Sequence, residues 1–149
     1  PKQLIQPMKQ ELTAIGFEDL RTAEDVTVAF HSRGTVLVVV NSVCECAASA
    51  ARPGVERSLE TIKRPNRITT IFAGFDTEAT AQARKHFLPF PPSSPCIGLF
   101  QDVKLVHYVD RHPIEVSSVA LISNNFKASY AVYCYSTQHL HIESLKNTL

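Results

Sequence analysis

The sequence predicts an α/β fold, because segments of strand composition alternate with segments of helix composition. Residues 35–40 are an apolar run with four valines, and residues 47–51 are rich in alanine. A second β-branched run covers residues 68–73, and two short apolar runs after residue 95 are close enough to pair as a hairpin. A strand-helix-strand crossover gives a parallel pair, and the hairpin adds antiparallel strands.

Length, composition and charge favour one soluble domain. The 149 residues are 44% apolar and 19% charged, enough for a core without disulfides. We expect a single domain over 1–149, with 135–149 as a C-terminal tail. The net charge of +1 gives no argument for nucleic acid, no stretch approaches a membrane span, and the first residues lack the apolar block of a signal peptide. We therefore expect a cytoplasmic protein with neither nucleic-acid nor membrane partners.

Two helices are expected before the first strand. The first covers residues 8–15, with Gly16 as its stop signal. Thr22 and Asp25 have the spacing of a capping box and predict a second helix that reaches Phe30. These helices form an N-terminal extension of the fold.

The central segments predict the order strand, helix, strand, helix, strand, strand, helix. Pro53 is expected to kink or interrupt the first of these helices, and Asp76 or Thr77 to cap the second. The expected ranges, in order, are 34–41, 44–62, 68–73, 78–87, 96–100, 104–109 and 114–134. This β-α-β-α-β-β-α succession, with two cysteines at the first strand-to-helix junction, is the thioredoxin-like arrangement.

Cys44 and Cys46 lie at that junction, separated by Glu45. The N–H groups at the start of a helix lower a thiol's pKa and stabilise its anion, so we expect a redox-active CxC pair with Cys44 as nucleophile and Cys46 as resolving thiol. Residues i and i+2 do not face each other on a helix, so an internal disulfide must bend the backbone, which favours monothiol chemistry. A metal-binding or redox-sensing thiol module is the alternative.

The segment 37–48, Leu-Val-Val-Val-Asn-Ser-Val-Cys-Glu-Cys-Ala-Ala, resembles the active-site region of the bacilliredoxin family. The resemblance extends over further blocks at residues 7–13, 16–20, 72–81, 92–95 and 107–115. Glu45 replaces the family's usual glycine, and Cys96 stands where a serine or another small residue is expected. Glu45 adds a negative charge that opposes thiolate formation unless solvent screens it.

This resemblance implies a thioredoxin-like fold and a thiol-disulfide oxidoreductase. Its implied reaction removes bacillithiol, or a similar low-molecular-weight thiol, from S-thiolated cytosolic proteins. A protein disulfide reductase or isomerase is the alternative within the same chemistry. The implied co-substrate is the small thiol itself, and we expect no bound cofactor and no metal.

Five further residues are candidates for the site. Ser94 and Pro95 precede a strand where proteins of the implied fold keep a cis proline beside the thiols, and the resemblance implies that they bind substrate. Cys96 would be an extra resolving thiol or a small core residue. Asn41 either donates a hydrogen bond near the thiolate or ends its strand. Arg52 belongs either to a basic rim that orients the carboxylates of bacillithiol or to an ordinary solvated helix face.

Overall fold

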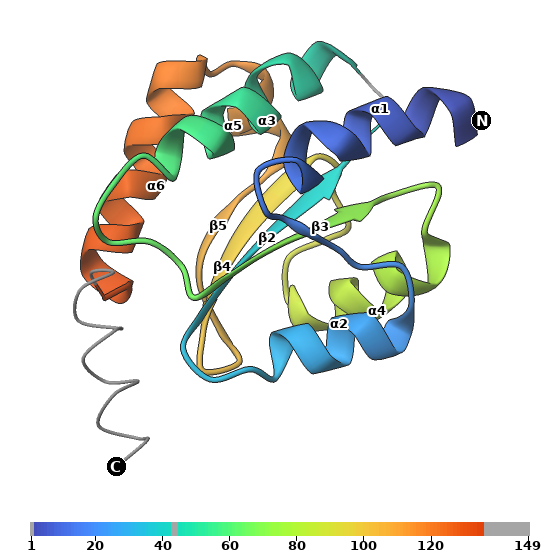
Figure 1. The fold of residues 1–149 in the computed structure, drawn as a ribbon, viewed down its shortest axis with the longest axis horizontal. Helices are drawn as coiled ribbons and strands as arrows, with labels where there is room; N and C mark the ends of the chain where they lie inside the picture. Colours follow the sequence, from blue (N-terminus) through green and yellow to red (C-terminus); the bar gives the residue numbers. More distant parts are fainter. Residues whose placement is uncertain (1, 43–44, 136–149) are drawn as a thin grey trace.

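The computed structural model describes residues 2–42 and 45–135, which form a mixed β-sheet with helices on both faces (Figure 1). In chain order the elements are α1 (Lys2–Thr13), β1 (Glu18–Asp19), α2 (Ala23–Phe30), β2 (Thr35–Asn41), α3 (Glu45–Ser58), β3 (Arg67–Phe72), α4 (Thr77–His86), β4 (Cys96–Gln101), β5 (Lys104–Val109), α5 (Arg111–Glu115) and α6 (Val119–Tyr133). Within this part of the chain, no helix is long and apolar enough to cross a membrane.

The sheet has the strand order β1-β3-β2-β4-β5. β1, β3 and β2 run parallel, whereas β4 pairs antiparallel with both β2 and β5. Helices α2 and α4 cover one face, and α1, α3, α5 and α6 lie over the other (Figure 1). The predicted succession β-α-β-α-β-β is confirmed from β2 to β5, and each strand boundary lies within one residue of its expected position.

The start of α2 has the predicted capping box. The Thr22 side chain accepts a hydrogen bond from the Asp25 backbone N–H at 3.0 Å, and the Asp25 carboxylate accepts one from the Thr22 N–H at 3.2 Å. This reciprocal pair satisfies backbone donors that the first helical turn leaves without partners.

Two predicted helix boundaries were wrong. Helix α1 begins at Lys2, not residue 8, and continues through Pro7. The buried Ile5 anchors this additional N-terminal segment. Pro7 has no N–H to donate to the Gln3 carbonyl, but Gln3 is exposed, so water can take the place of that donor. Helix α3 is continuous through Pro53 but ends at Ser58, not residue 62, and tighter i to i−3 hydrogen bonds follow.

The predicted last helix over residues 114–134 is two helices, α5 and α6. The chain breaks at Val116–Ser118, where the Ser118 hydroxyl accepts a hydrogen bond from the Leu121 N–H at 3.1 Å and caps α6. A serine that caps a new helix competes with continuation of the old one. Strand β1 was not predicted at all, because two residues carry no alternation that a sequence could reveal.

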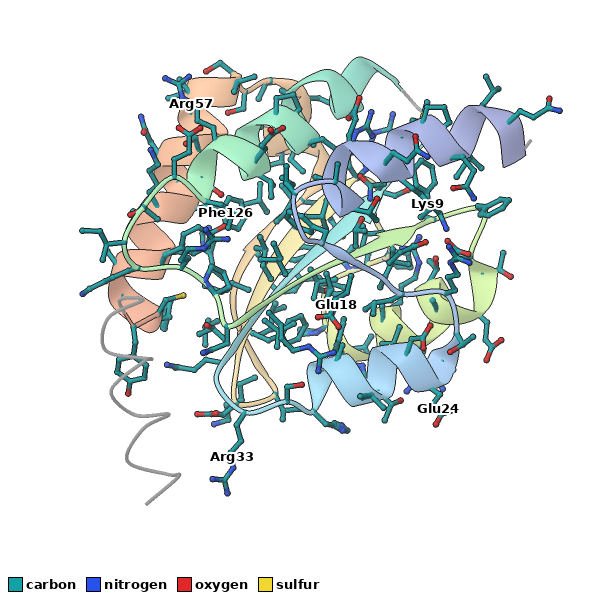
Figure 2. The ribbon with its side chains drawn as sticks, in the orientation of Figure 1. Lys9, Glu18, Glu24, Arg33, Arg57 and Phe126 are labelled. Carbon is teal, nitrogen blue, oxygen red and sulfur yellow. The ribbon has the colours of Figure 1, made fainter. Side chains whose placement is uncertain are left out.

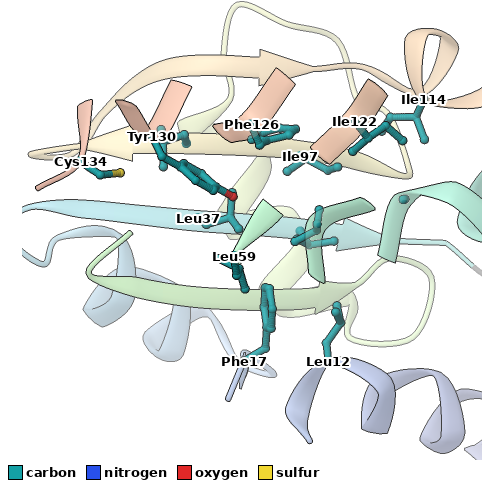
Figure 3. Packing of buried hydrophobic residues seen from close by; sticks show 14 residues of the cluster. Leu12, Phe17, Leu37, Leu59, Ile97, Ile114, Ile122, Phe126, Tyr130 and Cys134 are labelled. Carbon is teal, nitrogen blue, oxygen red and sulfur yellow. The ribbon is translucent and has the colours of Figure 1, made fainter. Parts of the chain in front are cut away.

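Alternate residues of β2 form the centre of two cores. Leu37 and Val39 pack in the cluster beneath α1, α3, α5 and α6, and Phe126 and Tyr130 of α6 belong to the same cluster (Figure 3). Val36, Val38 and Val40 point to the opposite face and pack with α2 and α4. The whole strand is buried, which explains its nearly continuous run of apolar residues.

A buried lysine joins three elements at one end of the sheet. Lys9 of α1 (Figure 2) is 4% exposed. Its ammonium lies 2.7 Å from the Asp76 carboxylate and 3.1 Å from that of Asp19. These ion pairs tie α1 to β1 and to the turn after β3. Two carboxylates compensate the ammonium that burial removes from water.

Candidate functional site

The CxC segment lies between β2 and α3. Strand β2 ends at Asn41 and α3 begins at Glu45, so Cys46 is the second residue of the helix. Cys44 and the side chain of Cys46 lie outside the described residues, and their predicted roles stay predictions. The start of α3 directs backbone N–H groups towards this junction and favours negative charge there.

The loop before β4 brings Ser94 and Pro95 to the same end of the sheet. Cys96, the first residue of β4, pairs with Val40 in β2, directly before the strand's last residue. Pro95 is buried and Ser94 is half-buried. The Ser94–Pro95 peptide bond is cis, which confirms what the resemblance implied. The two predicted substrate-binding residues therefore flank the strand end from which the chain enters the CxC segment.

The end of β5 holds this loop in place through three hydrogen bonds. The Ser93 hydroxyl donates to the Asp110 carboxylate at 2.5 Å and accepts from the Arg111 backbone N–H at 3.1 Å. The Arg111 guanidinium donates to the Ser94 carbonyl at 3.5 Å. Polar contacts to backbone and side chains of the loop thus fix the position of the Ser94–Pro95 bond.

Cys96 is a buried thiol. It is 3% exposed, and burial raises the pKa of the Cys96 thiol to about 11, although a hydrogen bond with Tyr108 opposes part of that shift. A thiol with this pKa is protonated near neutral pH and is a poor nucleophile. The structure therefore favours the interpretation of Cys96 as a small core residue over that of an extra resolving thiol. Cys134 is likewise buried, and burial raises its pKa.

Asn41 binds the neighbouring strand. Its side-chain amide donates to the Thr70 hydroxyl and, at 3.4 Å, to the Ile71 carbonyl, both in β3. The Asn41 backbone carbonyl also accepts from the Ala73 N–H at 3.1 Å. Because both hydrogens of the Asn41 amide are directed towards β3, neither is available to the thiolate. The structure therefore favours the interpretation that Asn41 ends β2 and binds β3.

Arg52 fits neither of the two positions that the sequence suggested. Its side chain is 9% exposed, and its Nε donates to the Glu11 carboxylate of α1 at 2.5 Å. It therefore lies neither on an exposed basic rim nor on a solvated helix face. Arg57, five residues further along α3, is exposed at the outer surface (Figure 2). The physical reason is the packing of α1 against α3, which the sequence alone did not reveal.

Sequence reasoning missed Arg84 and Tyr108, which lie beside the Pro95 loop. Both line a cavity of about 90 Å³ next to Cys96, together with Val40, Phe87 and residues of the proline-rich loop. Tyr108 stacks on Phe90 with ring centroids 4.4 Å apart. Arg84 lies one turn after Thr80 at the edge of the buried face of α4, and this spacing was the one signal that could have identified it.

The described residues contain no group of three or more His, Cys, Asp or Glu side chains that could hold a metal ion.

Comparison with protein families gives a match over most of the chain. The matching family model is described as disulphide isomerase and covers residues 1–134. A bacilliredoxin of Cytophaga hutchinsonii is 50% identical over 130 residues, which are 87% of this chain and 96% of that protein. Bacilliredoxins of Koribacter versatilis and Geobacillus kaustophilus are 44% and 43% identical over 92% and 89% of this chain, and over 95% and 93% of their own lengths.

Solved structures show the same fold at low sequence identity. The thioredoxin of Fasciola hepatica matches with a TM-score of 0.53 and 15% identity over 78% of this chain and 99% of that one. A second protein with a thioredoxin fold matches with a TM-score of 0.51 and 17% identity over 70% of this chain and 91% of the other. The predicted thioredoxin-like fold is confirmed.

Proposed function

This chain belongs to the bacilliredoxin family and is a thiol-disulfide oxidoreductase, and we propose that it removes bacillithiol, or a similar low-molecular-weight thiol, from S-thiolated proteins of the cytoplasm. The observation that carries the proposal is the position of Ser94 and Pro95 beside the end of β2, the strand that leads into the CxC segment. A client segment that contacts Ser94 and Pro95 would lie beside the end of β2, from which the chain continues to the proposed nucleophile, Cys44.

The proposed reaction is one thiol-disulfide exchange. The Cys44 thiolate attacks the sulfur of the small thiol in the client's mixed disulfide. A disulfide forms between Cys44 and the small thiol, the bond to the client's sulfur breaks, and the client leaves as a thiolate that takes a proton from water. No net oxidation or reduction accompanies this step, and it needs no bound cofactor.

Regeneration of Cys44 requires a second thiol. Cys46 can displace the small thiol and form an internal disulfide, or another molecule of small thiol can attack the mixed disulfide and leave as its own disulfide. Cys96 does not compete for this role, because its raised pKa keeps it protonated in the core. We propose that the small thiol and its reductase supply the electrons.

The test uses a client protein with one cysteine modified by bacillithiol. Wild type, Cys44→Ser and Cys46→Ser are incubated with it and analysed by intact-mass and peptide mass spectrometry. The proposal predicts that Cys46→Ser accumulates the bacillithiol adduct on Cys44 while the client loses it. Release of client by Cys44→Ser at the wild-type rate would contradict it.

A protein disulfide isomerase or reductase is the second candidate, supported by the description of the matching family as disulphide isomerase. In this function Cys44 would attack a disulfide between two protein cysteines. Rates on a bacillithiol-modified client and on a scrambled protein disulfide, measured with the same enzyme, separate the two candidates.

A further inference from the structure

A polar groove of about 400 Å³ lies beside the Pro95 loop, between α4 and α5. Ser94 lines one side of it, and the charged residues of its lining include two acids, Asp110 and Glu115, and two arginines, Arg84 and Arg111. Its volume lies within the range of roughly 300–1,000 Å³ that is typical of small-molecule sites. The groove is therefore large enough for a small polar ligand.

Both carboxylates of the groove have partners within the protein. Asp110 accepts hydrogen bonds from the Ser93 hydroxyl and from the Arg111 backbone N–H, each at 2.5 Å. Glu115 accepts one from the Arg111 guanidinium, also at 2.5 Å. These contacts hold the loop and α5, and neither carboxylate forms an ion pair with Arg84 in the part of the chain that the structure describes.

Arg84 has no such partner. Its side chain is half-buried, and it forms no hydrogen bond or ion pair with any residue in the part of the chain that the structure describes. It lines both the groove and the smaller cavity next to Cys96. A partly buried guanidinium has lost some of its hydrating water, so a bound anion would stabilise it. Its planar set of N–H donors matches a carboxylate in a bidentate geometry.

The groove also lies where a small thiol would extend during exchange. Ser94, part of its lining, precedes Pro95 and Cys96, and Cys96 pairs with Val40 close to the end of β2. The first cysteine of the CxC segment, Cys44, is three residues after Asn41. Because Ser94 lines the groove and lies at the same end of the sheet as this segment, groups attached to a sulfur that reacts here can extend towards the groove.

We propose that the groove binds the carboxylate groups of the low-molecular-weight thiol through Arg84 and so selects thiols that carry acid groups. The proposal rests on the proposed function, since it names the substrate subsite of the same reaction. Arg84 takes no part in bond exchange. It replaces Arg52, which is buried against Glu11, as the cation that recognises the anion.

The experiment compares two mixed disulfides of one client protein. One carries bacillithiol, with its carboxylates, and the other carries 2-mercaptoethanol, which has no charge. Second-order rate constants for release of the client thiol are measured for wild type, Arg84→Gln, Arg84→Lys and Lys85→Gln. Lys85→Gln is the matched control, because Lys85 is the exposed neighbour on α4 and its substitution removes the same charge.

We expect Arg84→Gln to lower the ratio of the bacillithiol rate to the mercaptoethanol rate by about tenfold, the effect of one lost charged hydrogen bond. Arg84→Lys is expected to keep part of the ratio, and Lys85→Gln all of it. An unchanged ratio in Arg84→Gln, or an equal change in Lys85→Gln, would overturn the subsite. A wild type that releases neither client, or a Cys44→Ser variant as fast as wild type, would instead overturn the proposed function.

Discussion

Arg52 and Arg84 lie on helices that each follow a parallel strand, yet only Arg52 forms an ion pair with another described residue. Arg52, in α3, is 9% exposed, and its Nε is bound by Glu11 from α1, although its buried Nη1 has no hydrogen-bond partner among the described residues. Arg84, in α4, is half-buried and has no partner among the described residues. In the sequence alone, each of the two arginines is simply one positive charge on a predicted helix. The difference shows that the third element packed against a helix decides whether its arginine gains a carboxylate partner within the protein.

The largest expected effect comes from removing the partner of Arg52. Glu11→Ala leaves a buried guanidinium without its carboxylate, and we expect the free energy of unfolding to fall by about 2 kcal/mol. The figure is below that of a fully buried pair because Glu11 itself is 54% exposed. Urea unfolding measures the change, with the exposed Glu56 substituted as Glu56→Ala for control. Equal losses in the two variants would remove the contrast between the arginines.

The same contrast between buried and available groups applies to the thiols. The pKa of Cys96 is raised from 9.0 to about 11 by burial, so the unfolded thiol ionises before the folded one. The resulting stabilisation is present below pH 9 and is lost as pH rises towards 11. Between pH 9 and pH 11, we expect the free energy of unfolding to fall by about 1–2 kcal/mol less in Cys96→Ala than in the wild type. Parallel pH profiles for the two proteins would show that Cys96 is not desolvated.

A smaller stability effect is expected at the second arginine. Arg84→Met removes a charge that forms no hydrogen bond or ion pair among the described residues. The free energy of unfolding, measured in urea, is therefore expected to stay within about 0.5 kcal/mol of the wild-type value. A loss comparable to that of Glu11→Ala would mean that Arg84 is part of the fold's own ion pairs, and the two arginines would no longer differ.

The smallest effect is expected beside the nucleophile. Glu45→Gly removes a negative charge adjacent to Cys44, which lowers the pKa of the Cys44 thiol by about half a unit or less when solvent screens the carboxylate. The pH dependence of alkylation measures it, in low salt and at about 1 M salt. A large, salt-independent decrease would instead show that the Glu45 carboxylate lies close to the thiol and out of solvent.

The elements of the fold could be predicted where the signal is local. The Thr22–Asp25 capping box and the valine run of β2 each specify their structure within a few residues. The two-residue β1 could not be found, since it exists only through its pairing with Thr69 and Thr70 of β3. The break between α5 and α6 depends on Ser118. Serine has poor helix propensity, but propensity alone does not show that this residue caps a new helix.

The site was predicted in part, for a similar reason. Pro95 was expected to be cis from the family resemblance, and it is. Arg52 was misplaced because its partner, Glu11, is 41 residues away and on another helix. Arg84 was overlooked because its spacing from Thr80 places it at the edge of the buried face of α4 but does not reveal that it lines a groove with Ser94, a residue from another segment.

The most direct test of this account measures the reactivity of each cysteine in the native protein. Iodoacetamide alkylation is followed across pH by peptide mass spectrometry, so that Cys44 and Cys96 are read separately. The account predicts that Cys44 reacts with a pKa below about 7.5, as at other helix starts, while Cys96 stays unmodified until the pH approaches its raised pKa of about 11. A Cys44 that reacts only above pH 9, or a Cys96 that reacts first, would contradict it.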